Sequence, residues 1–427
     1  MSTDTYDVVG VGIGPFNLAL AALADPLGLR AAFFERDDTF RWHPGMLIEG
    51  TTLQVPFLAD LVTLVDPTSR WSFLSYLRAH DRLFPFYFAE RFHVSRHEYE
   101  DYCRWVATAL PSCRFGSTVD SVRWDGTAFT VTAGGTSVRA ANVVLGVGAE
   151  PTVPDPLRPL LGDDVFHAAE YLPRADTLDG ASDVTVVGSG QSGAEVFLDL
   201  LRRGSRSGTR LRWLTSSPAF APMEYSKLGL EHFTPAYTEY FRSLDRGTRD
   251  DLVPAQWQLH KAISAETIAE IHDVLYERLV AGTEPAPQLL PNAEVVTADR
   301  HGSRIELGCR HLQRDEEFGV TTDKVVLATG YGSDVPTCLT PMAALIRWDD
   351  RGRFAVDGDY RVAADPAVTG GLYVQNAELH THGVGTPDLG LGAHRAAVIL
   401  NAITGRQAYR LPPPDRTAFT TFGTPPP

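Results

Sequence analysis

The stretch Tyr6-Asp-Val-Val-Gly-Val-Gly-Ile-Gly-Pro-Phe-Asn-Leu-Ala-Leu-Ala-Ala-Leu23 decides the fold class of this 427-residue chain. Its first apolar run predicts a buried strand, the glycines predict a tight turn, and the second apolar run predicts a helix. The next apolar run, Ala31-Ala-Phe-Phe-Glu35, predicts a second strand. The chain is therefore expected to open with a βαβ unit.

The glycine turn has the spacing of a dinucleotide-binding motif, Gly12-x-Gly14-x-x-Asn17. The two glycines let the backbone approach a pyrophosphate, and the N-terminus of the helix supplies N–H donors. Asn17 takes the place of the usual third glycine, so the packing of helix on strand must accommodate a side chain. Glu35 lies 21 residues after Gly14, where an acidic residue binds the ribose 2′-hydroxyl of a dinucleotide.

A second strand–turn–helix unit begins at Asp183 and carries the motif Gly188-Ser-Gly-Gln-Ser-Gly193. The strand that follows it ends in Thr215-Ser216-Ser217, without an acid. Because an acid there would repel a 2′-phosphate, NADPH is favoured over NADH. Arg212 and Lys227 are candidates to pair with that phosphate.

The composition fits a well-packed globular chain and excludes several classes of partner. Hydrophobic residues make up 44% and charged residues 21%, and the net charge is −15. This charge argues against binding to nucleic acid or to anionic membranes. The sequence has no run of 18 apolar residues that would predict a membrane span. Its polar start, Met1–Tyr6, does not resemble a signal peptide, so we expect a cytoplasmic protein. The spacing of the four cysteines fits neither a disulfide framework, nor a zinc site, nor a redox dithiol.

The two nucleotide folds predict an α/β protein with two Rossmann-like domains and a small helical substrate domain. We expect a discontinuous flavin domain of residues 1–165 and 320–427, a nicotinamide domain of 166–222 and 285–319, and a helical substrate region of 223–284. Residues 120–148 predict an antiparallel meander. Ala328-Thr329-Gly330-Tyr331, after a buried strand, predicts the return to the first domain. The proline-rich tail from Leu411, ending in Thr424-Pro-Pro-Pro, is expected to be extended and loosely held.

Two dinucleotide sites in one chain indicate an FAD reduced by NADPH. Because the cysteine spacing removes a disulfide acceptor, oxygen is the leading electron acceptor.

An ordered set of segments resembles the microbial flavin-dependent amine N-monooxygenases, the lysine and ornithine N-hydroxylases of hydroxamate siderophore biosynthesis. The resemblance runs from Asp7 to about Ile403 and includes Ala-Thr-Gly-Tyr331 and His382-Gly383. Its further segments are Gly-x-Gly-Pro-Phe-Asn-Leu-Ala, Phe40-Arg-Trp-His-Pro-Gly-Met46, Leu53-Gln-Val-Pro-Phe-Leu-Ala-Asp-Leu-Val62, Asp66-Pro-Thr-Ser69, Arg104-Trp105 and Gly-Ser-Gly-Gln-Ser.

The resemblance implies that NADPH reduces FAD, that the flavin and oxygen give a C4a-hydroperoxyflavin, and that a neutral primary amine attacks it to become a hydroxylamine. Gln54 and His43 match family positions near the flavin ring and are the candidate catalytic residues, although a loop histidine such as His43 is often a packing element. The residues expected to bind the cofactors are Gly12, Gly14, Asn17, Glu35, Trp42, Gln54, Gly188, Gly190, Gln191, Ser192, Gly193, Ser216, Thr329, Gly330, Tyr331 and Leu389.

The chain departs from the family at the substrate site. Where the lysine and ornithine enzymes carry Phe-Leu-Lys-Asp-Leu-Val, with the lysine holding the α-carboxylate, this chain has Phe57-Leu-Ala59-Asp-Leu-Val62. Less secure alignments place Leu230 at an asparagine, Leu259 within a Thr-Asn-Tyr stretch, and Gly390 at a late serine. A carboxylate without its charged partners binds poorly, so a diamine such as cadaverine or putrescine is favoured, closest to a diamine branch of the family.

Three readings remain open: the diamine hydroxylase, a lysine or ornithine N-hydroxylase that anchors its carboxylate elsewhere, and a non-catalytic flavin-binding redox module. For the diamine, Glu231 is the first candidate to bind the distal ammonium. We expect no metal site. We expect the protein to form a homo-oligomer.

Overall fold

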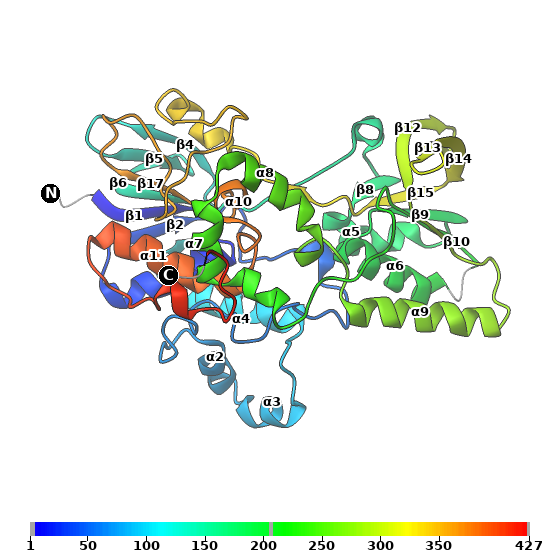
Figure 1. The fold of residues 1–427 in the computed structure, drawn as a ribbon, viewed down its shortest axis with the longest axis horizontal. Coiled ribbons are helices and arrows are strands. Elements are labelled where there is room, and N and C mark those ends of the chain that lie inside the picture. Colours follow the sequence, from blue (N-terminus) through cyan, green and yellow to red (C-terminus); the bar gives the residue numbers. More distant parts are fainter. Residues whose placement is uncertain (1–4, 205–207, 425–427) are drawn as a thin grey trace.

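The computed structural model describes residues 5–204 and 208–424, so the polar start Met1–Asp4 and the final prolines 425–427 lie outside the described residues. The chain forms two lobes, each built on its own sheet with parallel strands (Figure 1). The α/β class with two Rossmann-like sheets is thereby confirmed. No helix within the described ranges is long and apolar enough to cross a membrane.

The sheet of the first lobe has the order β3-β2-β1-β6-β5-β4, with β17 also paired to β6. The first half of β6 continues the antiparallel meander expected for residues 120–148, and its second half pairs in parallel with β17. The strands are β1 (Thr5–Val11), β2 (Ala31–Phe34), β3 (Cys113–Arg114), β4 (Val119–Trp124), β5 (Phe129–Ala133), β6 (Thr136–Leu145) and β17 (Gly371–Val374).

Both faces of this sheet are covered. Val8 of β1 packs into a core with the helices, whereas Val9 and Val11 pack into a second core on the opposite face, as the alternation of side chains along a strand requires. The helices of this lobe are α1 (Pro15–Ala24), α2 (Phe73–Ala79), α3 (Leu83–Ala89), α4 (Arg96–Ala109), α10 (Leu379–His382) and α11 (Gly392–Thr404).

The sheet of the second lobe is fully parallel, in the order β11-β10-β9-β15-β8. Helices cover one face, and an antiparallel three-stranded sheet covers the other. The parallel strands are β8 (Val165–His167), β9 (Asp183–Val187), β10 (Arg210–Leu214), β11 (Gln288–Leu290) and β15 (Lys324–Leu327). The covering elements are α5 (Tyr171–Arg174), α6 (Gln191–Gly204), β12 (Ala293–His301), β13 (Arg304–His311) and β14 (Glu316–Thr322).

The expectation that the chain returns to the first domain at residue 320 is wrong. β15 lies between β9 and β8 in the second lobe, and the strand that rejoins the first sheet is β17. β8 also lies in the second sheet although its first residue, Val165, was assigned to the first domain. A short apolar strand is compatible with either parallel sheet, so its sequence alone does not say which one it joins. The crossing itself is a two-stranded ribbon of β7 (Glu150–Pro151) and β16 (Tyr331–Gly332).

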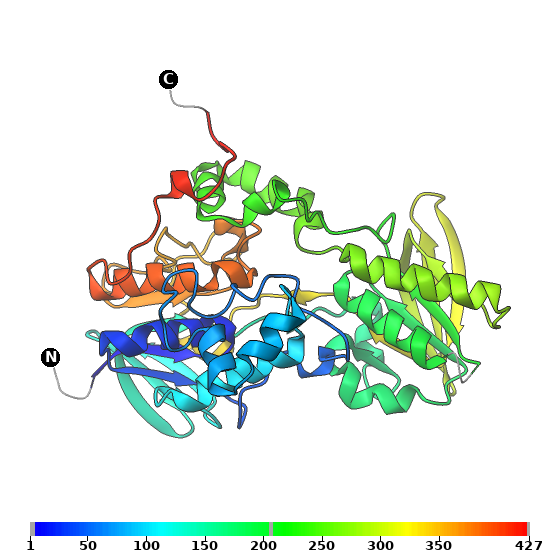
Figure 2. The same cartoon turned by 90° about the horizontal axis from the view of Figure 1, so that it is seen from below.

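The helical region expected at 223–284 spans both lobes rather than forming a body of its own (Figure 2). Tyr237 and Phe241 of α7 (Pro235–Ser243) pack with Val384 of the first lobe. Ile271 of α9 (Ala265–Val280) packs into the core of the second lobe. Between them lies α8 (Arg246–Ala255).

Asn17 joins three parallel strands beneath the first glycine turn. Its Nδ2 donates to the carbonyl oxygens of Val11, Gly12 and Val144, at 3.1, 2.8 and 3.4 Å. Its Oδ1 accepts from Nε2 of Gln375, just beyond β17, at 2.8 Å. The side chain is fully buried, so its hydrogen-bonding capacity is used within the protein.

We expect Asn17→Ala to lower the free energy of unfolding by about 1–3 kcal/mol, because it leaves buried carbonyls and Gln375 without partners. Asn17→Asp should be more destabilising still, since the carboxylate faces carbonyl oxygens with no donor of its own. Urea unfolding followed by circular dichroism measures both variants. An Asn17→Asp protein as stable as the wild type would contradict this assignment.

Candidate functional site

The first glycine turn lies at the carboxyl end of β1, where open α/β sheets bind ligands. Gly12 has φ +84°, and a Cβ there would lie 2.6 Å from the carbonyl oxygen of Gly146. At Gly14 the nearest atom to such a Cβ would be 3.9 Å away. The fold itself therefore requires glycine at position 12, whereas position 14 leaves open space. No side chain caps the N-terminus of α1, so its first N–H groups are available to a ligand.

Glu35 stands beside this turn, as its spacing predicts. One carboxylate oxygen accepts from the backbone N–H of Ile13 at 2.7 Å, and the other accepts from Asp37 at 3.2 Å. These bonds hold the acid at the carboxyl end of β2, which is the place of a ribose-binding acid in dinucleotide folds.

The second glycine turn repeats this arrangement. Gly188 has φ +114°, and a Cβ there would lie 2.2 Å from the carbonyl oxygen of Ala328. A Cβ on Gly193 would lie 2.2 Å from the carbonyl oxygen of Gly188, and one on Gly190 would lie 3.3 Å from that of Lys261. Ser192 is half-buried in the first turn of α6. Protein contacts therefore fix Gly188 and Gly193, and leave Gly190 as the roomier position.

Gln191, expected at a cofactor, has its side chain engaged by the protein. Its Oε1 accepts from the backbone N–H of Ser264 at 2.8 Å, and its Nε2 donates to Glu195 and Thr267 at 2.8 and 3.0 Å. The side chain is thus part of the scaffold around the glycine turn. Gln191 is the first residue of α6 and could meet a cofactor only through its backbone.

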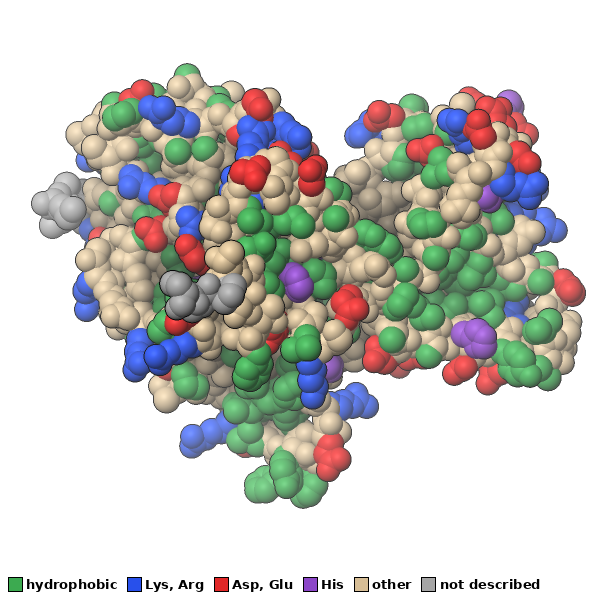
Figure 3. All heavy atoms as spheres, viewed as in Figure 1, with side chains coloured by type: hydrophobic (Ala, Val, Ile, Leu, Met, Phe, Trp, Pro, Cys, Tyr) green, Lys and Arg blue, Asp and Glu red, His purple; other side chains and the backbone are tan. Residues whose placement is uncertain are grey.

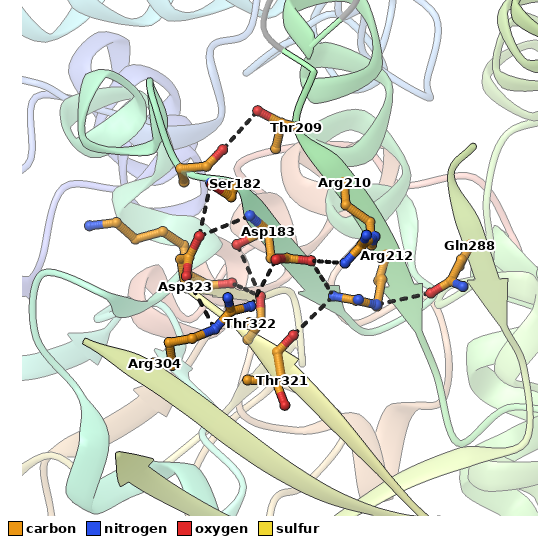
Figure 4. A network of polar contacts seen from close by, with 12 residues as sticks. Ser182, Asp183, Thr209, Arg210, Arg212, Gln288, Arg304, Thr321, Thr322 and Asp323 are labelled. Atoms are coloured by element: carbon orange, nitrogen blue, oxygen red, sulfur yellow. Dashed lines mark hydrogen bonds and ion pairs between the residues drawn. The ribbon is translucent and has the colours of Figure 1, made fainter. Parts of the chain in front are cut away.

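Ser216 is exposed just beyond β10, where the sequence predicts the nicotinamide ribose. Arg212, however, points away from that end of the sheet. Its guanidinium donates to Asp183 at 3.0 Å and to Gln288 at 2.9 Å, in the network of Figure 4. Asp183 begins β9, so this network lies at the amino ends of the strands, opposite the glycine turn. The expectation that Arg212 pairs with a 2′-phosphate is therefore wrong, and Lys227, which is exposed, stays a prediction.

Three expected site residues meet where the two lobes join. The ring of His43 lies 5.2 Å from that of Trp42 and 5.7 Å from that of Tyr331, between ring centroids. The surrounding protein, followed by the charge of Arg96, lowers the pKa of His43 to about 4, although the residue is exposed to solvent. The imidazole is therefore neutral near pH 7, which suits hydrogen bonding better than proton donation.

Thr329 and Gly330 tie the two crossings of the chain together. The hydroxyl of Thr329 donates to the carbonyl oxygen of Thr152, and the carbonyl oxygen of Gly330 accepts from the N–H of Thr152 at 2.9 Å. Their observed contacts are structural, and Tyr331 follows them directly in the ribbon.

Gln54 presents a buried donor without a partner. Its segment is held against residues 92–94 by bonds from Leu53 N to Val94 O and from Phe57 N to Phe92 O, both 2.9 Å. Within the described part of the chain, Nε2 of Gln54 and the hydroxyl of Tyr331 are buried and make no hydrogen bond. Because an unpaired buried donor is costly, both atoms are suited to meet groups of a bound molecule.

Ala59, Gly390 and Asp388 lie together. A Cβ on Gly390 would lie 3.9 Å from Cβ of Ala59 and 2.7 Å from Oδ1 of Asp388. The carboxylate of Asp388 accepts from the N–H of Gly390 at 2.7 Å and caps the turn that contains Leu389. Burial raises the pKa of Asp388 to about 6, while the Gly390 N–H and Arg395 act in the opposite direction. The carboxyl group of Asp388 therefore lies next to Gly390, which in turn lies next to Ala59, the position of the missing lysine.

Asp388 was not predicted as a site residue. The available signal was its place directly before Leu389 and Gly390, two positions expected at the cofactor and the substrate.

The other expected substrate residues are placed differently. Leu259 is 8% exposed and packs with Tyr237 and Phe241, so it belongs to an apolar core. Leu230 is half-buried in the turn η6 (Gly229–Phe233). The expectation for Glu231 is not met: its two oxygens accept from the backbone N–H groups of Phe419 and Thr420, at 2.8 and 2.7 Å.

The C-terminal tail is consequently held at this point rather than loose. The ring of Phe422 lies 4.9 Å from that of Tyr237 and 5.4 Å from that of His232. The hydroxyl of Thr417 accepts from the N–H of Ala236 at 2.9 Å. Tail residues 417–422 thus brace η6 and α7.

The whole chain matches known proteins. Residues 4–333 fit the model of the L-lysine 6-monooxygenase/L-ornithine 5-monooxygenase family. A putrescine N-hydroxylase of Shewanella oneidensis is 42% identical over 98% of this chain and 84% of that protein.

Two solved structures share the fold over nearly their full length. The FAD-bound cadaverine monooxygenase DfoA of the desferrioxamine pathway of Erwinia amylovora has a TM-score of 0.94 and 37% identity, covering 99% of each chain. The ornithine N-hydroxylase KtzI of Kutzneria sp. 744, with reduced FAD, NADP⁺ and L-ornithine, has a TM-score of 0.88 and 30% identity, covering 94% of this chain and 99% of that one. The family match over residues 4–333, the identity over nearly the full length and the shared fold together show that the chain belongs to the L-lysine 6-monooxygenase/L-ornithine 5-monooxygenase family.

Proposed function

We propose that this protein is an FAD- and NADPH-dependent monooxygenase that hydroxylates one terminal amine of a small diamine, cadaverine or putrescine. The observation that carries the choice of substrate is the carboxylate of Asp388 beside Ala59 and Gly390. The product, a hydroxylamine, is the group that acylation converts into a hydroxamate, which fits a role in hydroxamate siderophore biosynthesis.

The first lobe is the flavin lobe in this proposal. The uncapped N-terminus of α1, the open position at Gly14 and the acid Glu35 fit the pyrophosphate and ribose of FAD. The unpaired Nε2 of Gln54 fits a donor to the flavin ring. DfoA, at 37% identity, is FAD-bound.

The second lobe is the nicotinamide lobe. Its glycine turn fits a second pyrophosphate, and exposed Ser216 offers no acid to repel a 2′-phosphate. KtzI carries NADP⁺. FAD held there and reduced by NADPH would activate molecular oxygen, of which one atom goes to the amine nitrogen and the other leaves as water.

The charges at the substrate site favour a diamine over an amino acid. A diamine that presents one neutral amine for reaction carries an ammonium at its other end, and Asp388 can accept hydrogen bonds from that ammonium. A lysine or ornithine carries an α-carboxylate instead, which Asp388 would repel and for which Ala59 provides no cation.

The test of the proposed activity is hydroxylamine formation by the FAD-loaded protein with NADPH and oxygen. Adding cadaverine or putrescine should give hydroxylamine in proportion to the amine consumed. NADPH oxidation without hydroxylamine from any primary amine would instead identify a redox module without this catalytic activity.

We expect Gly14→Val to abolish FAD binding while leaving the lobe folded. The protein itself has room for a side chain there, so the clash falls on the pyrophosphate. Flavin absorbance of the purified variant, compared with its circular dichroism, separates the two effects. A folded variant with full flavin content would contradict the placement of FAD.

We expect Asp388→Asn to reduce kcat/KM for diamines by tens- to thousands-fold, since losing a buried charge contact costs about 2–5 kcal/mol. The asparagine can still accept from Gly390, so the turn is retained. Glu231→Gln is the matched control. It should make residues 419–422 more sensitive to proteolysis and leave kcat/KM for diamines unchanged. Equal losses of kcat/KM in both variants would count against Asp388 as the anchor.

We expect Ala59→Lys to weaken diamine use, because an ammonium at position 59 is close enough to pair with Asp388 and competes with the substrate. Steady-state hydroxylamine formation measures the change, with Ala59→Met as a control of similar length. If Ala59→Met impairs diamine use as strongly as Ala59→Lys does, bulk rather than charge is responsible.

We also infer a homo-oligomer in which a second copy covers α3. Phe84, Tyr87 and Phe88 of this helix are 76, 72 and 74% exposed, and α3 projects from the body as a mostly hydrophobic surface (Figure 3). Apolar patches of this kind mark protein contacts. Light scattering after size exclusion should give an oligomer for the wild type and a smaller species for Phe84→Asp combined with Phe88→Asp.

A further inference from the structure

A buried ion pair joins the two lobes. Arg96 is the first residue of α4 in the flavin lobe, and Glu195 lies on α6 of the nicotinamide lobe. Their contact is bidentate, with Nη1–Oε2 at 2.7 Å and Nη2–Oε1 at 2.8 Å. The two side chains are only 14 and 4% exposed, so the planar fork of Arg96 sets both the distance and the angle between the helices.

The same arginine holds a loop of the flavin lobe that enters the other lobe. Nη1 of Arg96 also donates to the carbonyl oxygen of Met46 at 3.2 Å. Met46 and Ile48 pack into the core of the nicotinamide lobe. A Cβ on the neighbouring Gly45 would lie 2.0 Å from the carbonyl oxygen of Ala169, so the two backbones are in direct contact there.

In the nicotinamide lobe, Glu195 of the pair is hydrogen-bonded to the residue that follows the second glycine turn. Oε1 of Glu195 accepts from Nε2 of Gln191, which directly follows Gly190 and also binds Ser264 and Thr267 at the start of α9. The N-terminus of α6, where the pyrophosphate of NADPH is expected, is thereby connected to α4 through side-chain contacts.

Besides the loop at Met46 and the helical segment from α7 to α9, one further connection joins the lobes. The chain crosses between them in the short ribbon of β7 and β16, two residues each. Contacts between domains of one chain commonly permit relative motion unless they are large and apolar. A buried, geometrically demanding pair at such a junction is suited to select one orientation.

We propose that Arg96 and Glu195 are positioning residues that hold the nicotinamide lobe at the angle needed for hydride transfer to the flavin. This inference rests on the proposed function. Arg96 and Glu195 form hydrogen bonds to each other, to Met46 and to Gln191, so the effect that we assign to the pair is on lobe orientation and nicotinamide placement.

The experiment compares Glu195→Gln, Arg96→Gln, the double variant and Arg96→Lys. Because a misplacement of about 1 Å can cost about 10²-fold in rate, anaerobic flavin reduction by NADPH should slow by about ten- to a hundred-fold in each glutamine variant. The double variant should be no slower than either single variant, since the pair is already broken. Arg96→Lys, which retains the charge, should recover part of the rate. Reduction by dithionite should not change.

Small-angle scattering of the same proteins provides a readout independent of turnover: the glutamine variants should have a larger radius of gyration than the wild type. Asp183→Asn is the matched control, because Asp183 and Arg212 form a pair of similar burial, 5 and 11% exposed, inside the nicotinamide lobe (Figure 4). This control should lose stability without slower reduction by NADPH.

Reduction rates within twofold of the wild type in Glu195→Gln and Arg96→Gln, with unchanged scattering, would overturn the inference. Equal slowing in Asp183→Asn would also overturn it, by showing a general loss of stability. If the wild type forms no hydroxylamine, the proposed function fails, whereas the scattering comparison still decides whether the pair fixes the lobes.

Discussion

The two chain segments that cross between the lobes in the β7–β16 ribbon each begin next to a residue whose backbone is in close contact with a glycine turn. Gly12 lies on the carbonyl of Gly146, just after β6, and Gly188 lies on the carbonyl of Ala328, just after β15. A Cβ at either glycine would collide with backbone, so each glycine turn is held close to the start of one of these two crossing segments. Since each turn is at the carboxyl end of its sheet, this constraint directs both dinucleotide sites towards the junction of the lobes.

The residues suited to chemistry collect along the same junction. His43 and Tyr331 meet there, and Arg96 of the same lobe as His43 forms the ion pair with Glu195 of the nicotinamide lobe. In the proposed function the substrate end is marked by Asp388 and Ala59, which lie far apart in the sequence and on either side of Gly390 in the flavin lobe. A carboxylate near an alanine that replaces a lysine would favour a ligand with positive charge at its far end.

The sequence predicted what depends on local pattern and failed where long-range contacts decide. The two glycine motifs, the antiparallel meander and Glu35 follow from spacing and hydrophobic periodicity, and the structure has them. The placement of β15 was missed because an isolated apolar strand fits either parallel sheet. Arg212 and Glu231 were assigned to ligands from residue type alone, but their partners, Asp183 and the N–H groups of Phe419 and Thr420, come from remote segments. Asp388 was missed because its proposed role depends on its place near Gly390 and Ala59, which come together only in the folded chain.

The most direct test of the account is kcat/KM for hydroxylamine formation by the wild-type protein with cadaverine, putrescine, lysine and ornithine at equal oxygen and NADPH. A site with Asp388 beside Ala59 predicts that at least one diamine exceeds both amino acids by tens-fold or more, the scale of a charged contact of about 2–5 kcal/mol. Faster hydroxylation of lysine or ornithine than of both diamines would contradict it and would require another cation to bind the α-carboxylate.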